Sequence, residues 1–159
     1  MNELIKEAAG GDLSGRYLTF YVGDIIYGIE LSHVLEIIQM QPITGIPAVP
    51  YYIKGVINLR GKIVPVIDIR RKLGIEEIEY GSRTCIIVVT IQEMQVGLIV
   101  DSVSEVITVD TEQFTAPPEF GIGSAERYLS GISRINNRVV LNLDCNKFFA
   151  SDLNTMGVL

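Results

Sequence analysis

Hydrophobic and polar residues in the stretch Tyr52–Leu73 follow the pattern of two short strands joined by a tight turn. Val56–Leu59 and Lys62–Ile69 form the predicted strands, with Arg60-Gly61 between them. Glycine adopts a positive φ without steric cost, as a two-residue hairpin loop requires. The second strand carries apolar side chains on both faces, which is typical of a strand buried on both sides, as in a barrel.

The same pattern recurs 76 residues later. Tyr128–Phe149 aligns with Tyr52–Leu73 without a gap, and the turn Arg60-Gly61 falls on Asn136-Asn137, a pair that also tolerates the left-handed conformation. Each copy ends in a predicted helical turn; the first has an N-cap aspartate and a C′ glycine. The identical pairs are Tyr52/Tyr128, Gly55/Gly131, Val64/Val140 and Asp68/Asp144.

A second repeat covers the preceding part of each half. Arg16–Val22 alternates in polarity and turns at Gly23-Asp24 into Ile25–Ile29, which predicts a hairpin. Ser32 is placed to cap a short helical segment, SHVLEII, and a short strand is the alternative for this element. With a shift of 69 residues, Tyr27–Met40 aligns with Val96–Val109.

The pattern as a whole predicts an all-β fold built by internal duplication. Short strands at this spacing, joined through proline-containing connectors, favour two small closed barrels with short helical turns. We expect a flexible arm over residues 1–15, a first barrel over about 16–80, a second over about 83–150, and a C-terminal tail over 151–159. Exchange of a terminal strand between the two units stays open, so the boundary near residues 80–83 is approximate.

Composition and charge exclude several classes of protein. The chain has 48% apolar residues and a net charge of −6, from 13 basic and 19 acidic residues. This charge argues against nucleic acid as the main partner. No apolar run approaches the roughly 20 residues that span a bilayer, and the first residues do not resemble a signal peptide. We therefore expect a cytoplasmic protein without membrane insertion.

Candidate catalytic and ligand-binding residues are few. His33, the single histidine, has Glu30 nearby but no nucleophile motif, so a small hydrolase is the weaker hypothesis. Cys85 and Cys145 do not have the spacing of a metal site and are expected to be small, buried hydrophobic residues. Neither a metal nor a cofactor is therefore expected. Two further groups of residues are not expected to be functional sites. Gly121-Ile122-Gly123-Ser124 is expected to be a flexible loop, and Asp101, Glu105 and Asp110 are expected to lie on a solvated strand edge.

Two polar residues stand out by position. Arg60 lies at the tip of an otherwise apolar hairpin, and Glu36 lies in an apolar run. Most hairpin arginines are solvated turn residues, and composition alone favours that interpretation. The alternative is a contact residue on a protein-binding surface, where arginine is enriched.

The residues that carry a family resemblance run from about Arg16 to Phe149. The motifs YGIEL-x-x-V-x-E-I-I, IKGVINLRG-x-IVPVID and VGLIVDSVSEVI, in this order, resemble a bacterial chemotaxis coupling protein of the CheW type. The resemblance implies two SH3-like five-stranded barrels packed on a shared hydrophobic core, and no catalysis. It implies an adaptor, recruited to receptor arrays, that couples the cytoplasmic tip of transmembrane chemoreceptors to the regulatory domain of the chemotaxis histidine kinase.

The resemblance also implies site residues. The receptor would be bound in a groove between the barrels, and Glu36 and Arg60 would pair with each other there. The receptor-binding set is Val34, Glu36, Arg60, Val103 and Val106; the kinase-facing set is Ile43, Thr44, Lys54 and Gly55. A regulatory domain cut from a larger kinase or from a coupling–receiver protein is the alternative. We expect the free protein to be monomeric.

Overall fold

The computed structural model describes residues 2, 5, 13–117 and 126–153. The strands are β1 (Arg16–Val22), β2 (Ile25–Glu30), β3 (Val34–Gln39), β4 (Ile53–Leu59), β5 (Lys62–Asp68), β6 (Cys85–Ile91), β7 (Met94–Val100), β8 (Ser102–Thr108), β9 (Phe114–Thr115), β10 (Leu129–Ile135) and β11 (Arg138–Leu143). The helical turns are η1 (Leu31–His33), α2 (Ile69–Leu73), η2 (Thr111–Gln113), η3 (Glu126–Tyr128) and α3 (Cys145–Phe149).

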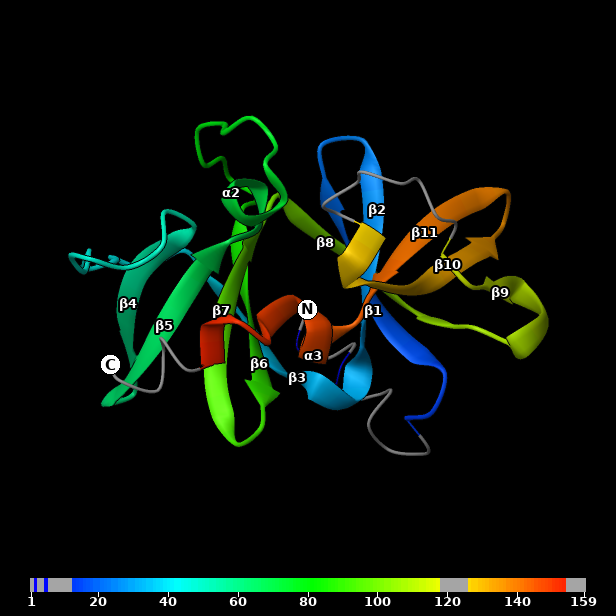
Figure 1. The fold of residues 1–159 in the computed structure, drawn as a ribbon, viewed down its shortest axis with the longest axis horizontal. Coiled ribbons are helices and arrows are strands. Elements are labelled where there is room, and N and C mark those ends of the chain that lie inside the picture. The colour runs from blue at the N-terminus through cyan, green and yellow to red at the C-terminus, as the bar shows by residue number, and fades with distance from the viewer. Residues whose placement is uncertain (1, 3–4, 6–12, 118–125, 154–159) are drawn as a thin grey trace.

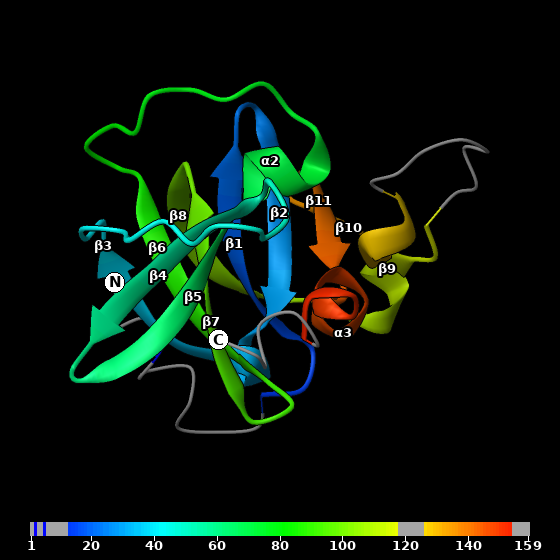
Figure 2. The ribbon, with the colours of Figure 1, turned by 60° about the vertical axis from the view of Figure 1, so that its left-hand side comes forward.

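The strands form two sheets that stand side by side (Figure 1). One has the order β8-β1-β2-β11-β10-β9 and is called barrel A below; the other has the order β3-β6-β7-β5-β4 and is called barrel B. In barrel B, Thr44 lies in the connector that follows β3 and forms a bridge with Val56 of β4 (Figure 2). Since β3 and β4 are the two edge strands, this connector brings the edges of the sheet together. Strand β9 does the same in barrel A, where Thr115 pairs with Ile132. The predicted all-β class is confirmed.

The barrels are not the two contiguous units that we expected at residues 16–80 and 83–150. Barrel B combines β3, β4 and β5 with the hairpin β6–β7, whereas barrel A combines β8 to β11 with the hairpin β1–β2. Each half of the chain therefore gives its first hairpin to the other half's barrel. The repeat could not reveal this, because two hairpins with the same apolar pattern fit either barrel.

The strand register shows that the exchange is symmetric. Asn142 of β11 lies beside Gly28 of β2 in a parallel pair, and Val66 of β5 lies beside Gly97 of β7 in the same way. These pairs are related by the shifts of 76 and 69 residues found in the sequence. Both internal repeats are thus structural repeats.

The predicted turns and caps are confirmed, with one correction. Arg60 and Gly61 both have positive φ (52° and 83°), as the hairpin turn requires. The Asp68 carboxylate accepts a hydrogen bond from the Arg70 amide at 2.9 Å and caps α2. For SHVLEII the short-strand alternative is correct and the Ser32-capped helix is wrong: after η1 the segment is strand β3, because its β-branched residues pair with β6.

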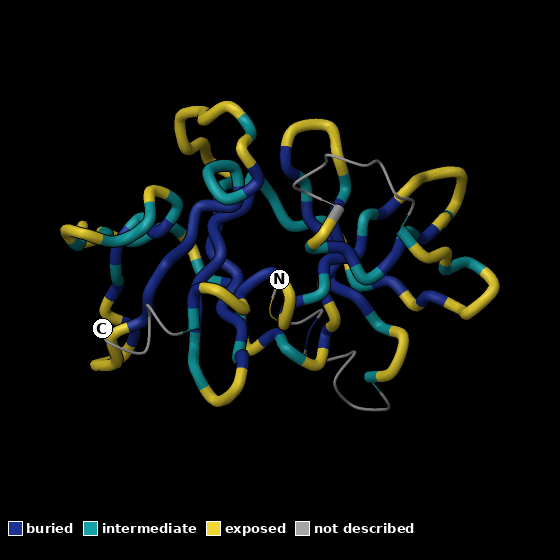
Figure 3. The backbone as a smooth tube through the Cα atoms, viewed as in Figure 1, coloured by how far each residue is buried: buried dark blue, intermediate teal, exposed yellow. Residues whose placement is uncertain are grey.

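The main hydrophobic core lies between the barrels. Figure 3 shows buried backbone concentrated where the two sheets face each other and exposed backbone at the hairpin tips. The central cluster takes residues from both sheets and from both short helices, including the fully buried Phe20, Ile67, Phe148 and Phe149. Each barrel also has a smaller cluster of its own. The shared core predicted for the two barrels is confirmed.

The interior of barrel A is more polar than that of barrel B. Ser133 and Asn142 are fully buried in barrel A, where the repeat-related residues of barrel B are Ile57 and Val66. The Asn142 Nδ2 group donates a hydrogen bond to Ser133 Oγ. The Asn142 Oδ1 atom has no hydrogen-bond partner among the described residues.

This pair yields a stability prediction. Ser133→Ala removes the acceptor and leaves the Asn142 amide unsatisfied, so we expect a loss of about 1–3 kcal/mol in the free energy of unfolding. The double variant Ser133→Ala/Asn142→Leu removes both polar groups and should unfold at the parent's urea midpoint or above it. Equilibrium urea unfolding checks both. A double variant less stable than Ser133→Ala would show that the polar pair stabilises barrel A.

Both ends of the chain contact the barrels. Asn2 and Ile5 belong to the predicted flexible arm, yet Asn2 bonds to Ile37 of β3 and Ile5 lies in the central core. Asp152 and Leu153 belong to the predicted tail, yet Asp152 is fully buried and Leu153 packs against the central core. At these four positions the ends are packed on the barrels rather than loose.

Candidate functional site

A groove of about 920 Å³ lies between the two barrels. The wall from barrel B is formed by Ile37, Ile38 and Gln39 of β3 and by residues 82–85 at the start of β6. The wall from barrel A is formed by Tyr21 and Gly23 at the end of β1 and by Asp101–Ser104. The groove therefore exists only because the two barrels are joined.

Glu36 and Arg60 form an ion pair beside this groove. Arg60 Nη2 contacts Glu36 Oε1, which confirms the predicted pairing. The Arg60 side chain is 69% exposed and the Glu36 side chain 23% exposed. Glu36 is on β3 and Arg60 is at the tip of the β4–β5 hairpin, so the pair connects the two edge strands of barrel B. Arg60 is thus a partnered surface residue rather than a freely solvated one.

The ion pair does not line the groove, in contrast to the expectation. The groove is lined by Ile37, Ile38 and Gln39 of β3, and neither Glu36 nor Arg60 is among its lining residues. Of the other predicted receptor-binding residues, Val103 lines the groove and Val34 is 8% exposed within the central core. Val106 packs against that core from β8. The five residues therefore do not form one contiguous surface within the groove.

The four predicted kinase-facing residues lie together at the β4 edge of barrel B. Thr44 exchanges two backbone hydrogen bonds with Val56, both of 2.9 Å. A Cβ at Gly55 would lie 2.1 Å from the Thr44 carbonyl oxygen, so only glycine allows this approach. Ile43 packs against the barrel B core, and Lys54 Nζ lies 5.3 Å from the Tyr80 ring centroid. Thr44 and Lys54 keep exposed surface, whereas Gly55 is buried.

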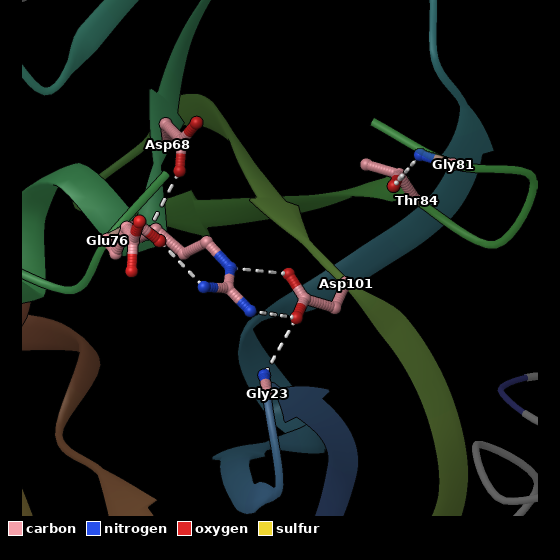
Figure 4. Close-up of polar contacts among 7 residues, drawn as sticks. Gly23, Asp68, Glu76, Gly81, Thr84 and Asp101 are labelled. Carbon is pink, nitrogen blue, oxygen red and sulfur yellow. Dashed lines mark hydrogen bonds and ion pairs between the residues drawn. The ribbon is translucent and has the colours of Figure 1, made fainter. Parts of the chain in front are cut away.

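An ion pair that the sequence did not indicate ties the barrels together at the end of the groove. Arg70 of α2 donates to both Asp101 oxygens, at 3.0 and 2.6 Å, and Asp101 also accepts from the Gly23 amide at 2.7 Å (Figure 4). Burial raises the pKa of Asp101, but these hydrogen bonds outweigh it and lower the pKa overall. Asp101 is therefore not the solvated edge residue that we expected; Glu105 and Asp110 are exposed.

A second ion pair joins the barrels on the helical side. Lys72 of α2 contacts Asp152 after α3, and the two side chains are only 2% and 1% exposed. The Tyr52 hydroxyl donates to the same carboxylate, and the Lys72 ammonium lies 4.5 Å from the Tyr52 ring centroid. Burial, and then the hydrogen bond to Asp152, raise the pKa of Tyr52 to about 12. Because Asp152 lies in the predicted tail, the sequence pattern did not reveal this pair.

Among the residues that the structure describes, His33 contacts a carboxylate and a backbone carbonyl group but no candidate nucleophile. Its Nε2 atom lies 3.8 Å from Glu30 Oε2, and its Nδ1 atom lies 3.3 Å from the Thr90 carbonyl oxygen, so its contacts are to β2 and β6 rather than to a nucleophile. The described part of the chain holds no group of three or more histidine, cysteine or acidic residues that could bind a metal.

Both cysteines are free and buried, as predicted. Burial raises the pKa of Cys85 to about 11 and that of Cys145 to about 12. The thiols are therefore protonated at neutral pH and unreactive. The glycine-rich stretch Gly121-Ile122-Gly123-Ser124 lies outside the described residues.

Among the described residues, no helix has the length and hydropathy needed to cross a membrane.

Curated relatives match nearly the whole chain. The chain is 36% identical to the chemotaxis protein CheW of Klebsiella aerogenes over 148 residues, which is 93% of this chain and 89% of that protein. It is 35% identical to the chemotaxis protein CheW of Bacillus subtilis over 131 residues, covering 82% of this chain and 84% of that protein.

A solved structure matches the fold. The scaffolding protein TtCheW from Thermoanaerobacter tengcongensis superposes with a TM-score of 0.75 at 34% identity, covering 82% of this chain and 88% of that chain. The predicted pair of SH3-like barrels is therefore confirmed. Residues 16–153 match the CheW-like domain. Because the CheW-like domain matches residues 16–153 and CheW relatives align with most of the chain, the chain belongs to the CheW family of chemotaxis scaffold proteins.

Proposed function

We propose that this protein is a non-catalytic cytoplasmic adaptor that couples transmembrane chemoreceptors to the chemotaxis histidine kinase within receptor arrays. Family membership supports the scaffold role. The observation that carries the proposal is the Glu36–Arg60 ion pair, which presents a mostly exposed arginine beside the groove between the barrels. Arginine in such a position is a common anchor of protein interfaces.

The groove suits a helical partner. A helix about 10 Å across can lie along the groove, with apolar residues against the partly buried Ile38 and Val103. Because Glu36 directly precedes the groove residue Ile37 on β3, a two-helix receptor tip could contact the groove with one helix and the ion pair with the other. In this arrangement Val34 and Val106 support the surface from beneath.

The kinase would bind the opposite edge of barrel B. Thr44 is exposed there and Lys54 is half-buried, and Ile43 and Gly55 hold the connector against β4. Two partners could then be bound at once, because β4 and the groove lie at different places around the barrel. Simultaneous binding is what an adaptor requires.

Reconstitution tests the proposal. The purified protein, a soluble chemoreceptor cytoplasmic fragment and the kinase are mixed in pairs and all together, and binding and kinase autophosphorylation are measured. We expect binding to each partner and a rise in kinase activity only in the three-component mixture. Binding to neither partner would contradict the proposal.

Arg60→Ala provides a residue-level prediction. Because the Arg60 side chain is 69% exposed, the melting temperature should stay within about 2 °C of the parent. Receptor-fragment affinity should fall at least about 10-fold, in the range of arginine anchors at interfaces. Lys62→Ala, which removes an exposed cation two residues along the same hairpin, is the matched control and should bind like the parent. Equal affinities for the two variants in titration calorimetry would exclude Arg60 from the interface.

A further inference from the structure

The edge of β3 that faces the groove is occupied by a side chain from the start of the chain. Asn2 Nδ2 donates to the Ile37 carbonyl oxygen at 3.1 Å, and Asn2 Oδ1 accepts from the Ile37 amide at 2.8 Å. One carboxamide therefore satisfies both backbone groups of an edge-strand residue, as a neighbouring strand would do. β3 is the outer strand of barrel B, so these two groups would otherwise be unpaired.

Asn2 lies within the groove. It lines the concave surface together with Ile37, Ile38 and Gln39. Three residues further along the chain, Ile5 is 8% exposed and belongs to the central core. Asn2 is thus bonded to the groove wall, and Ile5 is held separately in the central core.

We propose that Asn2, held by Ile37 and anchored by Ile5, competes with the helical partner for the β3 wall of the groove. This inference rests on the proposed function and adds regulation of the same site. A helix packed along the edge of β3 would occupy the space of the Asn2 carboxamide, which is bonded to the Ile37 backbone. The carboxamide must therefore leave β3 before that helix can seat.

Such competition lowers the apparent affinity for the helical partner, because only molecules in which the β3 wall is free can bind it. The apparent affinity equals the intrinsic affinity multiplied by the fraction of those molecules. If the carboxamide occupies Ile37 about nine-tenths of the time, its removal should tighten partner binding about 10-fold. The competition is local, because Asn2 bonds to the backbone of Ile37, whereas the Glu36–Arg60 ion pair is a contact between two other side chains.

The test compares the full-length parent with Asn2→Ala and Asn2→Ala/Ile5→Ser. Gln95→Ala, which removes a carboxamide from the β6–β7 hairpin that does not line the groove, is the matched control. Amide hydrogen exchange at Ile37 is measured in the free proteins. Affinity for a receptor cytoplasmic fragment and for the kinase is measured by titration calorimetry.

We expect exchange at Ile37 to be about 3–10-fold faster in Asn2→Ala than in the parent and in Gln95→Ala. The receptor fragment should bind Asn2→Ala about 3–10-fold more tightly, and kinase affinity should not change. Unchanged exchange, or faster exchange without tighter receptor binding, would overturn the competition while the parent's binding still supports the adaptor. If the receptor fragment binds none of the proteins, the proposed function fails and this inference fails with it.

Discussion

Lys72→Met is expected to lower the free energy of unfolding by about 3–5 kcal/mol, the cost of leaving one partner of a buried ion pair uncompensated. Lys72 and Asp152 are 2% and 1% exposed, so water cannot replace the lost ammonium. The Tyr52 hydroxyl remains as a donor to the carboxylate, and the ammonium's contact with the Tyr52 ring is lost as well. Equilibrium urea unfolding followed by circular dichroism measures the change.

Two further variants separate the charge from the packing. Lys62→Met removes an exposed lysine at the end of the hairpin turn and should change stability by no more than about 0.5 kcal/mol. Lys72→Met/Asp152→Leu removes both charges and should recover most of the lost stability, because buried pairs are often replaceable by apolar residues of similar volume. If the double variant is less stable than Lys72→Met, the pair is net favourable.

Ile67→Ala is expected to lower the free energy of unfolding by about 2–5 kcal/mol. The substitution removes buried apolar groups from the core and leaves a cavity in their place. Ile67 is fully buried in the central core, on the strand that pairs with β7 of the other half of the chain. Val64→Ala, at another fully buried position of β5, should be destabilising in the same way, by about 1–3 kcal/mol.

Ile63 on the same strand is the matched control for Ile67. Its side chain is 58% exposed, so Ile63→Ala should cost less than about 1 kcal/mol. The two substitutions delete the same atoms from positions with opposite burial, and thermal or urea unfolding compares them directly. Similar midpoints for Ile63→Ala and Ile67→Ala would mean that β5 is not buried between the two layers.

The Lys72–Asp152 and Arg70–Asp101 pairs also bear on function, since both connect elements on either side of the barrel contact. The groove is made by the two barrels together, and its shape depends on their relative position. A variant that loosens one of these pairs without unfolding the chain should therefore alter groove binding more than binding at the β4 edge of barrel B.

Part of the candidate site could be predicted from the amino-acid sequence. The prominence of Glu36 and Arg60 followed from charged residues placed in apolar surroundings, and the family resemblance indicated that they pair. The groove wall itself could not be predicted in this way. Ile37 and Ser102 are unremarkable strand residues, and what distinguishes them is their position where β3 and β8 face each other.

Local features were determined by the sequence itself. Strand alternation, the positive-φ turn at Arg60-Gly61 and the aspartate cap of α2 each depend on interactions within a few residues, which the order of side chains specifies. The duplication was also visible, because repeat-related strands need the same apolar pattern to fill equivalent barrel positions. The segment after Ser32 was the exception, since strand pairing with β6 overrode its helical periodicity.

Which copy pairs with which was decided only by the tertiary structure. The hairpins β1–β2 and β6–β7 present the same pattern to either barrel, so local sequence does not distinguish pairing within a half from exchange between halves. Because of the exchange, each barrel contains strands from both halves of the chain. In the resulting fold α2 lies beside Asp152, three residues after the end of α3. The buried Lys72–Asp152 pair, the Arg70–Asp101–Gly23 tie and the groove all arise from that arrangement, because each brings together residues that are remote in the sequence.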